Sequence, residues 1–99
     1  MDRVSFLDAV SGINYPDMLI TFFDHFITLK ELIEDSGKVN VNSSSASMIQ
    51  FDVDFNSKHK RDLALHQIES SSGVIITYQR PIHVRSNVLS DTKIEIILS

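Results

Sequence analysis

The chain has 99 residues, 42% of them apolar, which suits one domain with a single core and is too apolar for a disordered chain. It contains no cysteine, so disulfides, thiolate zinc sites and cysteine nucleophiles are excluded. The net charge of −4 argues against a nucleic-acid partner, because such proteins need a basic surface. We therefore expect residues 1–99 to form a single domain.

The N-terminal part lacks the features of a targeting segment. The most apolar stretch, 18–33, is interrupted by charged residues and cannot span a membrane, and the first residues do not resemble a signal peptide. Two interpretations remain open. The chain is a protein with a native cytoplasmic start, or it is the periplasmic piece of an inner-membrane protein whose anchor is missing.

Residues 1–13 are expected to be an extension or a short helix beginning at Ser5. A helix–strand–strand unit follows over 14–55. Its helix starts near Pro16 and ends at 35–37, with Gly37 as a left-handed C-cap. The helix is predicted from apolar residues that recur at spacings of three and four, namely Leu19, Phe22, Phe23, Phe26, Leu29 and Ile33.

After Lys38 the apolar residues recur at every second position, which predicts a hairpin with one solvent-exposed face. Val39 and Val41 form the apolar positions of its first strand. In the second strand Asp52 and Asp54 share one face, and they are interpreted as solvated polar residues of a half-buried strand and not as a catalytic pair.

A second helix–strand–strand unit is predicted over 56–99. Asn56 or Ser57 caps its helix, which ends at 70–73. The strand over 74–84 is expected to break at Pro81 or to lie at a sheet edge, because proline cannot donate a ladder hydrogen bond. The residues expected in the core across both units are Phe22, Phe26, Leu29, Phe51, Val53, Ile76 and Ile96.

The repeated unit predicts an α+β fold. Four amphipathic strands form one antiparallel sheet, and two helices cover its apolar face in a two-layer sandwich.

No motif predicts catalysis. His25, His59, His66 and His83 are not spaced as helical metal ligands, and no phosphate-binding glycine loop or nucleophile motif occurs. We therefore expect no enzyme activity, no cofactor and no metal site.

One charge feature opposes local electrostatics. Lys58, Lys60 and Arg61 occupy the first turn of the second helix, where the helix dipole favours acids. They are either a binding site for an acidic partner or a solvated surface turn, and their neutralisation is expected to leave folding almost unchanged.

The duplicated pattern resembles the circularly permuted ferredoxin-like domain of inner-membrane assembly-platform proteins of type IV pili and type II secretion systems, the PilN, PilO and GspM kind. The residues that carry this resemblance are 15–16 with 19–33 as the first helix, 48–55 as a strand, and 62–68 followed by 73–77, within a region of about 14–99. It implies a non-enzymatic domain that acts by pairing with a protein partner or as a homodimer, on the periplasmic face of the inner membrane.

Three functions are weighed, of which an enzyme or small-ligand protein ranks last because no group of residues converges on a pocket. The first is a protein–protein interaction domain that associates through a sheet edge or a helix flank, as in such an assembly platform. The alternative is a small bacterial or phage immunity or inhibitor protein that neutralises a partner protein.

Overall fold

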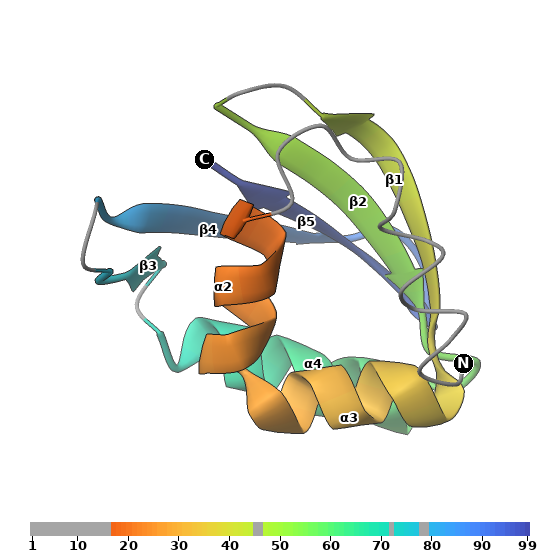
Figure 1. Ribbon diagram of the computed structural model, residues 1–99. Coiled ribbons are helices and arrows are strands. Elements are labelled where there is room, and N and C mark those ends of the chain that lie inside the picture. The colour runs from red at the N-terminus through yellow and green to blue at the C-terminus, as the bar shows by residue number, and fades with distance from the viewer. Residues whose placement is uncertain (1–16, 45–46, 72, 78–79) are drawn as a thin grey trace.

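The computed structural model describes residues 17–44, 47–71, 73–77 and 80–99. The short helix predicted from Ser5 lies outside these residues. The described elements in chain order are α2 (Asp17–His25), α3 (Ile27–Ser36), β1 (Lys38–Ser44), β2 (Ile49–Asp54), α4 (Lys58–Glu69), β3 (Val74–Ile75), β4 (Ile82–Val88) and β5 (Lys93–Leu98) (Figure 1).

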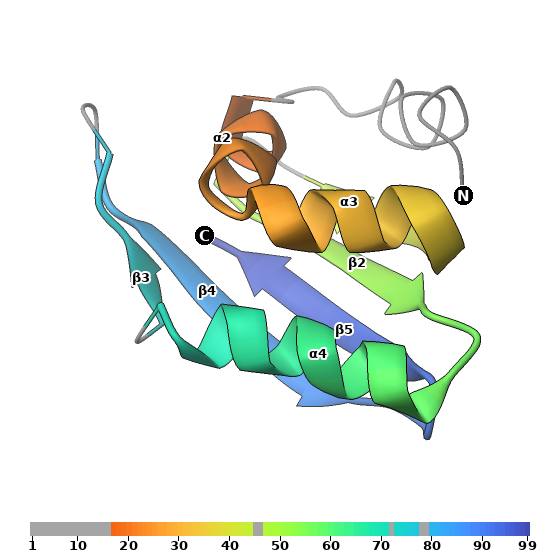
Figure 2. The same ribbon diagram turned by 90° about the horizontal axis from the view of Figure 1, so that it is seen from below.

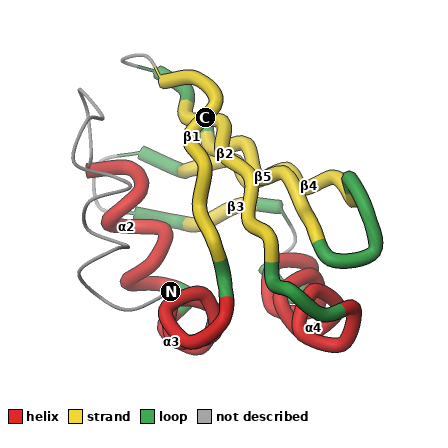
Figure 3. Tube along the Cα trace, turned by 90° about the vertical axis from the view of Figure 1, so that its right-hand side faces the viewer, coloured by secondary structure: helices red, strands yellow, loops and turns green. Residues whose placement is uncertain are grey.

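The strands form one antiparallel sheet in the order β1-β2-β5-β4-β3. The three helices lie on one face of this sheet (Figure 2), and Figure 3 shows α3 and α4 side by side in that layer. The α+β class and the antiparallel sheet are confirmed. The structure has five strands where four were predicted, because the strand expected over 74–84 is divided into β3 and β4.

The core lies between the sheet and the helices. On β2 and β5 every second residue is fully buried, while the residues between them are only partly covered. This is the alternation expected when one face of a sheet packs and the other meets water. The fully buried residues of these two strands are Ile49, Phe51, Val53, Ile94, Ile96 and Leu98.

The predicted first helix is divided in two. Phe26, with φ −109° and ψ 65°, lies between α2 and α3 and is not helical. The chain turns there so that Phe22 and Phe23 of α2 pack on Phe51, with ring centroids 6.2 and 6.1 Å apart. Phe26 itself stays buried. A spacing pattern could not reveal this turn because the same apolar residues are buried on both sides of it.

Gly37 follows the end of the helix as predicted, but it is not the left-handed C-cap that was expected. Its φ of −96° is extended and not left-handed. A Cβ at this position would lie 3.1 Å from Ile33 Cα and 3.1 Å from Val53 Cγ1. Glycine is therefore required because the helix end and β2 approach closely. Of the two described glycines, the left-handed one is Gly73, with φ +79°.

The predicted interruption near Pro81 is present, but the expected alternation before it is wrong. Ile76 was predicted in the core and is 79% exposed, whereas Ile75 is buried. β3 ends at Ile75, so the two-residue period does not continue to Ile82. The other residues predicted for the core are buried.

Candidate protein-interaction surfaces

Hydrogen bonds show which way the backbone of β2 faces. The amide of Phe55 donates to the carbonyl of Thr92 at 2.9 Å, which continues the β2–β5 register by one residue pair. Successive residues of an antiparallel strand direct their main-chain groups to opposite neighbours. The residues that bond to β5 are therefore the odd-numbered ones, and Asp52 and Asp54 direct their main-chain groups toward β1.

The same alternation directs some main-chain groups of β1 to the outer edge of the sheet, where no described strand bonds to them. Asn40 pairs with Asp52 and Lys38 with Asp54, so these residues bond to β2. Val39 and Val41 consequently direct their N–H and C=O groups away from the sheet. Among the described strands, none pairs with this edge.

The side chains along β1 are mostly uncharged. Val39 and Val41 are half-buried and pack against the core on the helix-covered face. Asn40 is exposed on the open face, where its amide donates to Asn42 Oδ1 at 3.0 Å. Asn42 in turn donates to Asp52 Oδ1 at 2.7 Å. The register shifts between Val41 and Ser43, which limits the regular part of the edge.

The opposite side of the sheet is partly closed. The amide of Val84 donates to the carbonyl of Gly73 at 2.9 Å, so β3 covers the first half of β4. Ser86 and Val88 share the direction of Val84 and lie beyond the reach of β3. This leaves a second open edge, shorter than that of β1.

Of the three cations predicted as a binding site, Lys58, Lys60 and Arg61, one is buried and bonded within the fold. Arg61 is among the buried residues, and its guanidinium donates to the carbonyl of Ser90 at 2.7 Å and to Asp62 Oδ1 at 2.8 Å. The Arg61 hydrogen bond lowers the pKa of the Asp62 carboxyl. The expectation that neutralising all three cations would hardly change folding therefore does not hold for Arg61, which ties α4 to the β4–β5 turn.

Lys58 and Lys60 lie at the start of α4, which is capped as predicted by Ser57: its hydroxyl accepts the amide of Lys60 at 3.2 Å. Lys60 also reaches Asp35 on α3 at 3.4 Å. Lys58 is exposed. The partner-binding role of these two lysines stays a prediction.

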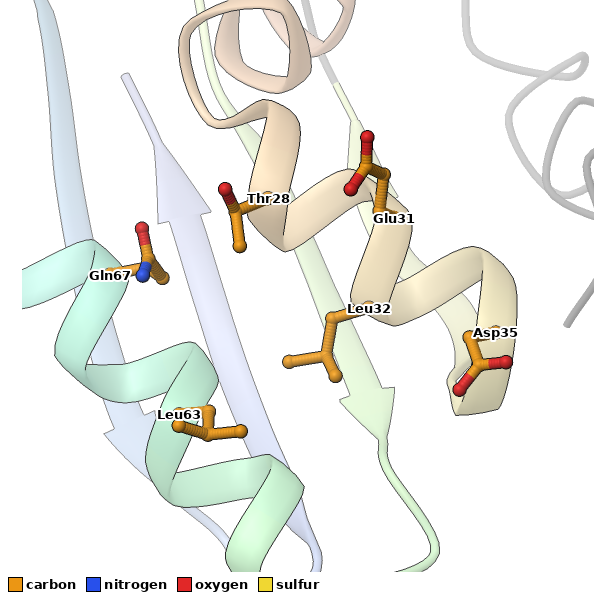
Figure 4. A pocket seen from close by; sticks show the side chains of 6 residues that line it. All are labelled: Thr28, Glu31, Leu32, Asp35, Leu63 and Gln67. Carbon is orange, nitrogen blue, oxygen red and sulfur yellow. The ribbon is translucent and has the colours of Figure 1, made fainter.

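A groove lies between α3 and α4 (Figure 4). Its volume is about 320 Å³. Leu32 of α3 and Leu63 of α4 face each other across it, and Thr28 lies opposite Gln67 at one end (Figure 4). The residues that line the groove are Thr28, Glu31, Leu32, Asp35, Leu63 and Gln67.

The titratable residues considered for catalysis are spread over the molecule. All four histidines are exposed, and the His25 ring packs in a T-shaped arrangement with the Phe26 ring at a centroid distance of 4.8 Å. Among the described residues, no three histidine or carboxylate side chains are placed to hold a metal ion.

Asp52 and Asp54 both lie on the open face of β2, each partly exposed. The pKa of Asp54 is lowered mainly because its carboxylate accepts the Asn56 amide at 3.1 Å, with the Thr92 hydroxyl and two lysines helping. Asp54 therefore holds the turn before α4, where Asn56 has a φ of +57°.

The sequence predicted association through a sheet edge and an edge position for the strand over 74–84, which β3 occupies, but it did not single out the edge of β1. Two features of the sequence could have pointed to β1 as an open edge: it is the first strand of its hairpin, and it has no charged residue in its interior. The groove gave no such signal, because Leu63 fits an apolar helical pattern and only its 45% exposure shows that it faces the groove.

Comparison with protein-family models, curated proteins and solved structures finds no match. No helix in the described part of the chain is long and apolar enough to cross a membrane.

Proposed function

We propose that this chain is a non-enzymatic protein–protein interaction domain that pairs with a second copy of itself through the outer edge of β1. The observation that carries the proposal is the outward direction of the Val39 and Val41 main-chain groups on an edge strand. Open edges of this kind are sites of strand addition, because each exposed N–H and C=O can bond to another chain.

β1 is suited to pairing with itself in an antiparallel register centred on Asn40. Val39 of each copy would exchange both main-chain bonds with Val41 of the other, and the two Asn40 side chains would face each other. The half-buried Val39 and Val41 side chains would cover each other on the helix-covered face. Lys38 would lie opposite Asn42 of the second copy, so no like charges meet.

Such an edge contact is small. Stable interfaces bury roughly 1,200–2,000 Å², and a single strand pair contributes only part of that area. We therefore expect reversible dimers that form at micromolar or higher concentration, as in an assembly whose parts are held together by several weak contacts.

The resemblance to type IV pilus and type II secretion platform proteins extends the proposal to an assembly-platform component. Its support is the strand order: apart from the two-residue β3, the second strand of each hairpin, β2 and β5, is central. Moving the first strand of a β-α-β-β-α-β chain to its end gives this helix–strand–strand repeat. In such a platform, pairing between domains is the function.

The test is a charge placed at the centre of the edge. Asn40→Lys puts a lysine opposite Asp52 within one copy, which favours the folded monomer. In the dimer it puts two lysines face to face, which disfavours pairing. Sedimentation velocity over a concentration series should show wild-type dimers and monomeric Asn40→Lys.

Asn87→Lys is the matched control, because Asn87 lies opposite Glu95 on the same open face but on β4. It should dimerise like the wild type. Mixing Asn40→Lys with Asn40→Asp should restore a mixed dimer, since the two charges then attract. Wild-type protein that stays monomeric to several hundred micromolar, or Asn40→Lys that dimerises like Asn87→Lys, would contradict the proposal.

A further inference from the structure

We infer that the groove between α3 and α4 binds a basic amphipathic helix of a partner protein. This inference rests on the proposal that the chain acts by binding proteins, but it uses a surface separate from the β1 edge. The groove lies in the helix layer, so strand pairing and helix binding do not compete for residues (Figures 3 and 4).

The middle of the groove is lined by apolar side chains that solvent can reach. Leu32 is half-buried, and Leu63 is 45% exposed although its neighbours Ala64 and Ile68 on α4 are buried. The two leucines point toward each other from opposite walls (Figure 4). A leucine from a third helix placed between them would bury apolar surface of all three side chains, which is the main source of affinity in helix-in-groove binding.

The rim of the groove is acidic on one side. Glu31 and Asp35 are one helical turn apart on α3 and both are exposed. The facing wall contributes Leu63 and Gln67, which carry no charge. A bound segment therefore meets negative charge along one flank only, which favours lysine or arginine on one flank of its apolar stripe.

Lys60 supports this charge assignment. It already donates to Asp35 at 3.4 Å, which shows that a cation is accommodated beside this carboxylate. The pair is exposed, since 74% of the Asp35 side chain is open to solvent, so it is weak and easily exchanged. Glu31 makes no ion pair among the described residues and remains available to a partner's cation.

The other end of the groove is polar but uncharged. Thr28 and Gln67 face each other there (Figure 4). Along the groove, Glu31 therefore lies on the α3 rim near Thr28, the two leucines follow, and Asp35 lies at the far end (Figure 4). A helix with leucines at i, i+3, i+4 and i+7 and lysines on one flank matches this order.

The experiment uses a synthetic helix of leucine and lysine with that spacing, added to the full chain labelled for NMR. Backbone shifts should be confined to residues around Thr28, Leu32, Leu63 and Gln67. A shuffled peptide of the same composition, with its leucines spread around the helix, should bind at least about tenfold more weakly, because it cannot bury an apolar stripe.

Matched variants separate the groove from general acidity. Leu63→Glu should weaken binding of the peptide by roughly tenfold or more. Ile76→Glu should not, because Ile76 is an exposed apolar residue that follows β3 and does not line the groove. Glu31→Gln should weaken binding and reduce its salt dependence, whereas Glu69→Gln on the other flank of α4 should leave both unchanged.

Equal binding of the shuffled peptide, shifts scattered over all acidic surfaces, or unchanged binding by Leu63→Glu would overturn the inference. Because Asn40→Lys does not touch the groove, it should bind the peptide normally. Failure of strand pairing and failure of the groove are therefore observed separately.

Discussion

Arg61 gives the sharpest prediction for stability. Its side chain is 10% exposed, and its guanidinium bonds the carbonyl of Ser90 at 2.7 Å. Arg61→Met keeps much of the apolar stem but removes this charge-assisted bond and leaves the carbonyl without that donor. We expect a loss of about 2–3 kcal/mol, since hydrogen bonds to charged groups contribute roughly 1.5–3 kcal/mol and some packing is lost.

The contact to Asp62 adds little to this loss, because more than half of that side chain is exposed to solvent. The assay is urea unfolding, in which the midpoint should fall without a change in slope. Lys60→Met is the control, since its exposed pair with Asp35 is worth about 1 kcal/mol or less. If Arg61→Met costs no more than Lys60→Met, the buried hydrogen bond does not hold the β4–β5 turn as argued.

Three further predictions follow from particular contacts. Gly37→Ala should destabilise by about 1–3 kcal/mol in urea unfolding, because the new methyl group meets Val53 and the end of α3 at 3.1 Å. Ile76→Ser should change stability by less than about 0.5 kcal/mol, whereas Ile75→Ala should cost about 2 kcal/mol or more, since only Ile75 is buried. Asp54 has a lowered pKa in the fold, so it stabilises above about pH 4, and this contribution is lost as pH falls further; Asp54→Asn should therefore be less stable at neutral pH and show a flatter acid unfolding curve.

For most strands, the sequence was enough to predict which residues face the core, because alternation reports directly on a face that packs. Phe51 and Val53 on β2, and Ile96 on β5, are buried as their alternation predicts. The prediction of one continuous strand over 74–84 is wrong for a physical reason. β3 lasts only two residues, so the alternation of buried and exposed residues does not extend from β3 to β4.

The helices show a different limit. Phe26 satisfies the helical spacing and is buried, yet the chain bends there, because Phe22 reaches Phe51 only if α2 turns over the sheet. Such a turn is decided by tertiary packing and leaves no local mark. The same holds for Gly37, where the close approach of Val53 to the end of α3 explains the glycine.

For the candidate surfaces, the sequence identifies the charged residues but does not show which groups they contact in the fold. Lys58, Lys60 and Arg61 look equivalent in the sequence, but the structure buries Arg61, pairs Lys60 with Asp35 and leaves Lys58 exposed. Burial separates these three cations, and burial depends on where the β4–β5 turn meets α4.

The proposed function depends most directly on the edge of β1, and residue-resolved amide exchange tests it. The Val39 and Val41 amides point outward and should exchange fast in dilute protein, whereas the Asn40 amide bonds to β2 and should be protected throughout. Protection of Val39 and Val41 should rise with protein concentration in the wild type and stay low in Asn40→Lys. If these two amides exchange equally fast at every concentration, the β1 edge does not pair and the proposed function is contradicted.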